Sequence, residues 1–198
     1  MRIIITCIVG LIVWNANGQD DKLVAAGVLP FTVINDTVYL LLGYDADKPG
    51  WTDFGGGREM VGSLDDEKRL ETPREIAVRE FFEECRMVYG KEEIELYFRP
   101  DAYITAVNGV YRSYVVYFPY KSRQEIRQAL IPVDEKFEIF NEKKDFYWIS
   151  LNELKSVIRS GSNRLPNSPN REILYKHFYN TLNKVLQDDQ VDYLFKKY

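Results

Sequence analysis

The sequence predicts an α/β protein, and the order of its elements suits an α/β/α sandwich with a mixed β-sheet. Runs rich in β-branched and aromatic residues alternate with helical patterns instead of forming one block of strands. Three Ser/Thr-x-x-Glu capping boxes mark the starts of helices. The chain has 198 residues, of which 45% are hydrophobic and 28% charged, and this composition is ordinary for a globular protein with one sizeable core.

Residues 1–18 have the layout of a secretory signal peptide. A positively charged start leads into an apolar run from Ile3 to Trp14, and small residues follow at Ala16 and Gly18. This run is shorter than the roughly 20 residues that span a membrane, so no stable membrane span is expected. A buried first strand or helix is the alternative, but acidic residues and a new strand pattern follow at once. The sequence therefore predicts cleavage after Gly18, a secreted or extracytoplasmic protein, and a single domain over 19–198.

The residues before the first helix predict a hairpin and a short aromatic strand. Asn35-Asp36 forms a turn between two strand-like runs, and Gly55-Gly56-Gly57 predicts a second turn. The segment from Met60 to Leu70 is charged and without periodicity, so we expect an exposed excursion. The expected strands are Leu23–Ile34, Thr37–Tyr44 and Trp51–Phe54, with a polar loop over Asp45–Gly50.

A helix follows, and local signals mark its start. Thr72 stands at the N-cap, Pro73 at the first helical position, and Glu75 completes a capping box. Apolar residues at helical spacing predict the face that packs on the core. Its members are Val78, Phe81, Phe82 and Cys85, which makes Cys85 a small core residue rather than a nucleophile.

The opposite face of this helix is acidic. Glu80, Glu83 and Glu84 stand at positions i, i+3 and i+4, where like charges repel and destabilise a helix. A divalent cation that prefers carboxylate oxygens, such as Mg²⁺, relieves this repulsion and also bridges to phosphate oxygens. The alternative is a solvated acidic face without a ligand.

The rest of the chain predicts further strands and helices. Asn108-Gly109 signals a hairpin turn, and capping boxes begin helices at Ser122 and Ser150. Ser168-Pro169 is expected to cap a last helix, a C-terminal extension that includes Ile173, Leu174 and a structural His177. The expected strands are Glu95–Phe98, Ala102–Val107, Tyr111–Phe118, Phe137–Phe140 and Phe146–Ile149, the last of them after an acidic loop over 141–145.

Charged residues on and before the acidic helix stand in a specific order, namely Glu71, Arg79, Glu80, Glu83 and Glu84, with hydrophobic residues at Phe81 and Met87. This order resembles the signature box of the Nudix hydrolases. The run from Trp148 to Leu154 also resembles the way in which Nudix domains end their sheet and begin their last common helix. The resemblance covers most of the chain after Gly18 in outline, and it is specific over Glu71–Met87 and Trp148–Leu154.

Two features depart from the family pattern. If Gly57 is the counterpart of the family's glycine, it stands further before Glu71 than that glycine does, and the loop between them carries an insertion. Gly62 is the less favoured counterpart. Arg86 stands where the family has a glycine, at a position with φ > 0 that costs a non-glycine residue about 1 kcal/mol. Gly90 is expected to end the helix one turn later instead.

The resemblance implies roles for individual residues. Glu80, Glu83 and Glu84 would hold Mg²⁺ (or Mn²⁺), and Arg79 would pair with Glu71 to fix the helix against the loop. One of the three helix glutamates or Glu142 would take a proton from the attacking water, with Glu138 as a second candidate. The lining of the site would include Gly56, Gly57 and Glu59.

By the same resemblance, the protein would be a metal-dependent hydrolase of the diphosphate linkage in a nucleoside diphosphate joined to another group. A catalytically inactive Nudix-fold module that binds a nucleotide or a protein is the alternative. The net charge of −4 argues against a basic nucleic-acid-binding surface, although a capped RNA end suits the same box. Nudix domains often pair, which leaves a homodimer open.

Overall fold

The structure is a computed structural model, and it describes residues 22–45, 50–62, 67–99, 102–129, 140, 142–169 and 172–198. Three expectations fall outside these residues. They are the signal peptide over 1–18, the strand over Phe137–Phe140 except for Phe140 itself, and the candidate Glu138.

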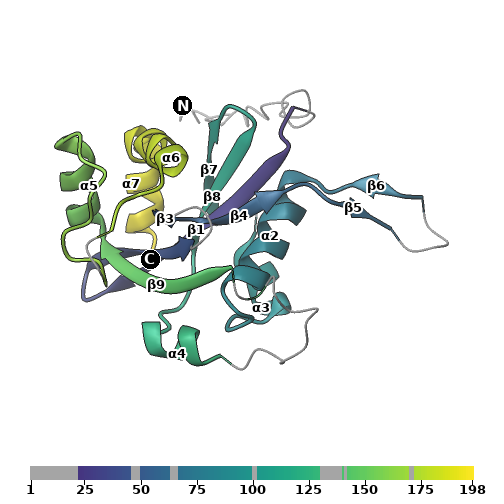
Figure 1. The fold of residues 1–198 in the computed structure, drawn as a ribbon, viewed down its shortest axis with the longest axis horizontal. Coiled ribbons are helices and arrows are strands. Elements are labelled where there is room, and N and C mark those ends of the chain that lie inside the picture. Colours follow the sequence, from purple (N-terminus) through teal and green to yellow (C-terminus); the bar gives the residue numbers. More distant parts are fainter. Residues whose placement is uncertain are drawn as a thin grey trace, which may run out of the picture.

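The protein is built on a seven-stranded mixed sheet (Figure 1). Strands β1 and β8 run parallel to each other, whereas the other neighbours in this sheet are antiparallel. A separate two-stranded ribbon consists of β5 and β6. The strands are β1 Ala25–Ile34, β2 Thr37–Asp45, β3 Gly50–Thr52, β4 Phe54–Gly57, β5 Met60–Val61, β6 Arg69–Leu70, β7 Tyr103–Asn108, β8 Tyr111–Tyr117 and β9 Lys143–Ser150.

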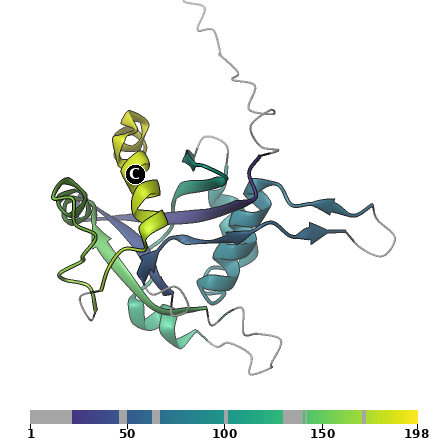
Figure 2. The same ribbon diagram turned by 45° about the horizontal axis from the view of Figure 1, so that its top comes forward.

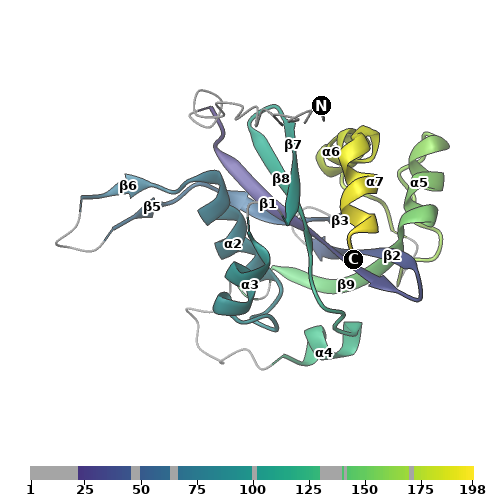
Figure 3. The same cartoon turned by 180° about the vertical axis from the view of Figure 1, so that it is seen from behind.

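Helices cover both faces of the large sheet, and the predicted α/β/α architecture is confirmed. Helix α2 packs against β1 and β4 on one face, whereas α5, α6 and α7 gather on the other (Figures 1 and 3). The helices of the described residues are α2 Pro73–Glu84, α3 Lys91–Tyr97, α4 Arg123–Gln128, α5 Leu151–Arg159, α6 Lys176–Gln187 and α7 Asp189–Lys196.

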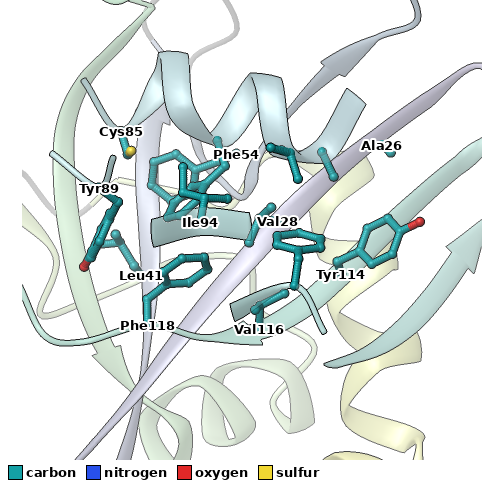
Figure 4. Close-up of a cluster of buried hydrophobic side chains, with 14 of the residues drawn as sticks. Ala26, Val28, Leu41, Phe54, Cys85, Tyr89, Ile94, Tyr114, Val116 and Phe118 are labelled. Carbon is teal, nitrogen blue, oxygen red and sulfur yellow. The ribbon is translucent and has the colours of Figure 1, made fainter. Parts of the chain in front are cut away.

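The strands supply a core to each layer because successive side chains point to opposite faces. Val28 and Leu41 belong to the core beneath α2, whereas their neighbours Leu29 and Leu40 belong to the core beneath α5, α6 and α7. Figure 4 shows the first of these cores, where Cys85 lies among the buried side chains at the end of α2. Cys85 is fully buried, as its place on the apolar helix face predicts.

The large sheet divides where β3 passes into β4. Strand β1 pairs with β2 over Phe31–Ile34, but over Ala25–Val28 it pairs with β4 instead. Strand β2 in turn pairs with β3 from Gly43 to Asp45. The segment Gly50–Gly57 therefore leaves β2 and joins β1, with Asp53 at the crossover. The triple glycine lies in strand β4, so the prediction of a turn there was wrong.

Helix α2 begins as predicted but ends earlier. The capping box of Thr72 and Glu75 is present in both directions. At the other end, Met87 N donates to Phe82 O and Arg86 N donates to Glu83 O, the two bonds of a Schellman motif. Arg86 has φ 59° and so adopts the left-handed conformation that closes the helix. The prediction that Gly90 ends this helix was wrong, because Gly90 is the N-cap of α3.

Three other elements differ from the sequence prediction. Residues 143–145 were expected to lie in an acidic loop, yet they begin strand β9. Glu95–Phe98 was expected to be a strand, yet Lys91–Tyr97 forms helix α3, which packs on α2 through Ile94. The last long helix begins at Lys176 rather than near Ser168-Pro169. The residues before Lys176 are extended, because Trp51 N donates to Ile173 O and Tyr175 N donates to Trp51 O at the free edge of β3.

The expected excursion between Met60 and Leu70 contains a β-hairpin. Strands β5 and β6 pair there and project away from the body of the protein in every view (Figures 1 to 3). In the described part of the chain, no helix is long and apolar enough to cross a membrane.

Candidate active site

Arg79 organises the acidic face of α2. Its Nε and Nη2 donate to the two carboxylate oxygens of Glu71, at 2.9 and 3.0 Å. Its Nη1 donates to Glu80 Oε1 at 2.9 Å and to Glu83 Oε2 at 3.2 Å. A further bond from Nη2 reaches the backbone oxygen of Gly57 at 2.8 Å. One guanidinium thus connects the helix, the loop before it and the end of β4.

Glu71 is buried beneath this guanidinium. The backbone N–H of Glu59 also donates to its Oε2 at 3.0 Å. Burial opposes ionisation of Glu71, but the bonds from Arg79 and Glu59 outweigh burial and lower its pKa. Glu71 therefore stays ionised and holds the start of the hairpin insertion against the helix.

Glu80 packs against bare backbone. A Cβ atom at Gly56 would overlap its carboxylate, so glycine leaves room for the carboxylate in its observed position beside β4. Burial raises the pKa of Glu80 to about 7, and the attraction of Arg79 only partly opposes this. The acidic face is therefore not solvated, because Glu80 and Glu84 are both buried.

Glu84 forms a buried ion pair that the sequence did not predict. Its Oε1 lies 3.0 Å from Nζ of Lys143, and each side chain is only 2% exposed. Its Oε2 is buried without a hydrogen-bond partner among the described residues. Burial raises the pKa of Glu84 above its ordinary value, against the attraction of Lys143. Lys143 is the first residue of β9, and only the fold brings it to the end of α2.

The remaining predicted residues lie around this centre. Burial raises the pKa of Glu83, and the nearby charges of Glu59 and Glu142 add to the effect. Glu142 is exposed and close enough to raise the pKa of Glu80 and Glu84 as well. Glu59 Oε1 lies 3.8 Å from Arg79 Nη1. The structure thus brings together every predicted site residue that it describes, and Glu138 alone lies outside the described residues. The residues brought together are Gly56, Gly57, Glu59, Glu71, Arg79, Glu80, Glu83, Glu84 and Glu142.

The carboxylate oxygens on α2 are of the chemical type that binds a divalent cation. Three carboxylates with raised pKa values stand on adjacent turns, and one oxygen of Glu84 is buried without a partner. They are not arranged around a common point, however. Within the described residues, no group of three or more His, Cys, Asp or Glu side chains could hold a metal ion as it stands. Arg79 pairs with the carboxylates of Glu80 and Glu83, and Lys143 pairs with that of Glu84.

A second buried network lies behind Lys143. The Tyr111 and Ser113 hydroxyls donate to Asp53 Oδ2 at 2.9 and 3.0 Å, and Thr52 Oγ1 donates to Oδ1 at 3.1 Å. Burial raises the pKa of Asp53, although these hydroxyls and Lys143 oppose the effect. The Tyr111 hydroxyl lies where a Cβ atom of Gly55 would stand, so this glycine makes room for the network.

A pocket of about 370 Å³ opens beside this network. Asp45, Asp53 and Lys143 line it on the side of the sheet, and Tyr175, His177 and Phe178 line it from α6 and the residue before it. Lys143 therefore stands between the pocket and the carboxylates of α2. A structural role was predicted for His177 and no role for Lys143 or Asp53, because contacts between distant segments place them here.

Comparisons with known proteins find similar solved structures but no matching family. No protein-family model matches the sequence, and no curated protein matches it either. Among solved structures, the Nudix hydrolase RenU from M. smegmatis has a TM-score of 0.40 and 13% identity, over 84% of this chain and 85% of that one. The C. elegans Ap4A hydrolase has a TM-score of 0.37 and 17% identity, over 69% and 85%.

The Nudix domain of Shewanella oneidensis NrtR, solved in complex with ADP ribose, has a TM-score of 0.42 and 14% identity, over 83% of this chain and 88% of that one. At such TM-scores, the function has to be inferred from the residues of the chain itself.

Proposed function

We propose that this protein is a Nudix-type hydrolase, which cleaves the diphosphate linkage of a nucleoside diphosphate joined to another group with the help of Mg²⁺ or Mn²⁺. The observation that carries this proposal is the arrangement around Arg79. One guanidinium joins Glu71, Glu80 and Glu83 in the order of the family's box. Beside it, Glu84 keeps one buried oxygen without a partner among the described residues.

Glu80, Glu83 and Glu84 are the residues that would hold the cation. A divalent cation held by them would neutralise the diphosphate and lower the pKa of the attacking water. The raised pKa values of these glutamates support this role, because buried carboxylates without sufficient positive charge retain protons. A bound cation would supply that charge and release the protons.

The proton of the attacking water goes to a carboxylate as the bridging P–O bond breaks. Glu142 suits this role because it is exposed and acts electrostatically on all three helix glutamates. A helix glutamate not engaged with the cation is the other candidate. Arg79 and Glu71 act by holding the helix and the loop in register.

The pocket beside Lys143 would receive the nucleoside. Its volume of about 370 Å³ lies within the range of small-molecule sites. The rings of Tyr175 and Phe178 offer flat apolar contacts, and the carboxylate of Asp45 offers an acceptor for hydroxyl groups. A ligand that fills the pocket would place its phosphates at Lys143, beside Glu84.

A binding module without catalysis is the second candidate, and one observation favours it. Arg79 and Lys143 pair with all three helix glutamates, and none of the described groups of acidic, His or Cys side chains is ready to hold a metal. Such a module would bind a nucleotide in the pocket and release it unchanged.

Phosphate release separates the two candidates. The purified protein is incubated with a panel of nucleoside diphosphate derivatives, with and without Mg²⁺, in the presence of a coupling phosphatase. We expect Mg²⁺-dependent turnover that is lost in Glu83→Gln and kept in Glu95→Gln, whose carboxylate pairs with Arg74 on the surface. Binding without turnover would support the module instead.

We also propose export with cleavage after Gly18, on the sequence pattern alone. Expression of the full chain in a secreting host, followed by N-terminal sequencing of the product, tests this. A product that still begins at Met1 would contradict it.

A further inference from the structure

Lys143 stands in an environment that resembles a cation site. Its Nζ lies 3.0 Å from Glu84 Oε1 and 3.8 Å from Asp45 Oδ2. Asp53 is close enough that its carboxylate and the Lys143 ammonium act on each other electrostatically. Two carboxylates from different parts of the fold thus contact one buried ammonium group, and a third acts on it electrostatically.

The backbone is shaped to admit this lysine. A Cβ atom at Gly43 would stand 2.9 Å from Cδ of Lys143, so the aliphatic part of the side chain lies against bare backbone of β2. The side chain is 2% exposed, yet it lines the pocket. The ammonium is therefore held in a fixed position between the pocket and α2 and does not extend freely into solvent.

The two carboxylate oxygens of Glu84 have different surroundings. Its Oε1 faces Lys143, whereas its Oε2 is buried and has no partner within the described residues. Carboxylate oxygens around a small hard cation are the usual environment of Mg²⁺ and Mn²⁺. A second divalent ion on the Oε1 side would have to occupy the space of the ammonium or face its charge at close range.

We propose that the Lys143 ammonium fills a second cation position, bounded by Glu84 and Asp45, and so limits the site to one divalent ion. This inference rests on the proposed function, because it assumes that Glu80, Glu83 and Glu84 Oε2 hold the first ion. Lys143 is then a positioning residue for Glu84 and a permanent positive charge beside the phosphates of a ligand in the pocket.

The number of Mn²⁺ ions bound per chain tests the inference. Free Mn²⁺ is followed by its electron paramagnetic resonance signal as the full chain is titrated with the metal. We expect one ion per wild-type chain and two per Lys143→Met chain, since methionine keeps most of the volume but removes the charge. Lys155→Met removes a lysine that pairs with Asp192 on the surface, so it should still bind one.

Two ions in the wild type, or one ion in folded Lys143→Met, would overturn the inference. Binding of no ion by any of these proteins would contradict the proposed metal site itself and is thus a distinct result. The variant leaves buried carboxylates without their cation, which is strongly destabilising. If it fails to fold in metal-free buffer, Mn²⁺ is expected to restore its circular dichroism spectrum, and lack of restoration would equally count against the inference.

Discussion

The guanidinium of Arg79 and the carboxylate of Glu71 meet in a fork of two hydrogen bonds, 2.9 and 3.0 Å long. Lysine cannot reproduce this planar pairing. Arg79→Lys should therefore lower the free energy of unfolding by about 1–3 kcal/mol, because it leaves buried acceptors unpaired. Urea denaturation measures the change. Arg74→Lys, at an exposed pair with Glu95, serves as the control and should stay within about 1 kcal/mol of wild type. Equal losses in both variants would contradict the prediction.

The three consecutive glycines should respond differently to alanine. Gly55→Ala is expected to unfold the protein or destabilise it severely, since the new Cβ would overlap the Tyr111 hydroxyl and stand 2.6 Å from Gly27 Cα. Gly57→Ala should be nearly neutral, because nothing lies within 4 Å of its Cβ position. Thermal melting of the two variants checks this. Comparable melting temperatures would show that β1 and β4 do not approach each other as described.

Gly56→Ala should affect the acidic face rather than the fold as a whole. Its Cβ would displace the Glu80 carboxylate, which is the end of a side chain and can move. We expect weaker Mn²⁺ binding with retained circular dichroism, measured by titration against the wild type. Gly57→Ala is the matched control for this experiment. Unchanged Mn²⁺ affinity in Gly56→Ala would argue against Glu80 as a ligand.

The metal-free protein should become less stable as the pH rises from about 5 to about 7. Burial raises the pKa of Glu80 to about 7 and also raises that of Glu83, whereas the unfolded chain loses these protons near pH 4.3. The folded state thus binds more protons over this interval, so the free energy of unfolding falls as pH increases. Melting temperatures in a chelator, at several pH values, measure the trend.

Two further measurements bear on this pH dependence. Glu80→Gln should flatten the slope, and Mg²⁺ should raise the melting temperature more at the upper end of the interval, because it binds the ionised carboxylates. The lowered pKa values of Glu71 and Asp145 act in the opposite direction. Their contribution is lost only as the pH falls below about 4, outside this interval. A melting temperature that rises from pH 5 to 7 in chelator would contradict the prediction.

Replacing Arg86 by glycine should destabilise the protein less than replacing it by alanine. Its guanidinium donates to the backbone oxygens of Arg127 and Lys143 at 3.0 and 3.1 Å and lies over the ring of Phe146. Both variants lose these contacts, but only glycine relieves the cost of φ 59°. Arg86→Gly is thus expected to be more stable than Arg86→Ala by about 1 kcal/mol in urea denaturation. Equal stabilities would mean that the helix ends differently in solution.

Local signals explain why α2 and most of its site residues could be predicted. The capping box, the proline and the spacing of the glutamates all act within a few residues. The burial of Glu80 and Glu84 could not be predicted in the same way, because it depends on glycines in β4 and on a lysine in β9. The sequence shows an acidic face, but only the fold decides whether water or protein covers it.

The errors in the fold have related causes. Glu95–Phe98 is a short apolar and charged run, and periodicity alone cannot separate a strand from a short helix at that length. Ile173 and Leu174 stand at helical spacing with later residues, yet the open edge of β3 draws them into extended pairing with Trp51. Asp53 gave no signal in the sequence, because its partners Tyr111 and Ser113 come from β8.

The crossover at Asp53 divides the sheet into two leaves. Lys143 belongs to the leaf of β2, β3 and β9, whereas Glu84 stands on the helix that packs against the leaf of β1, β4 and β8. Their ion pair therefore connects the two leaves, and residues of both leaves line the pocket. A ligand that increases the separation of the two leaves would lengthen the contact between Lys143 and Glu84. The acidic face of α2 would in this way respond to the width of the ligand group that fills the pocket.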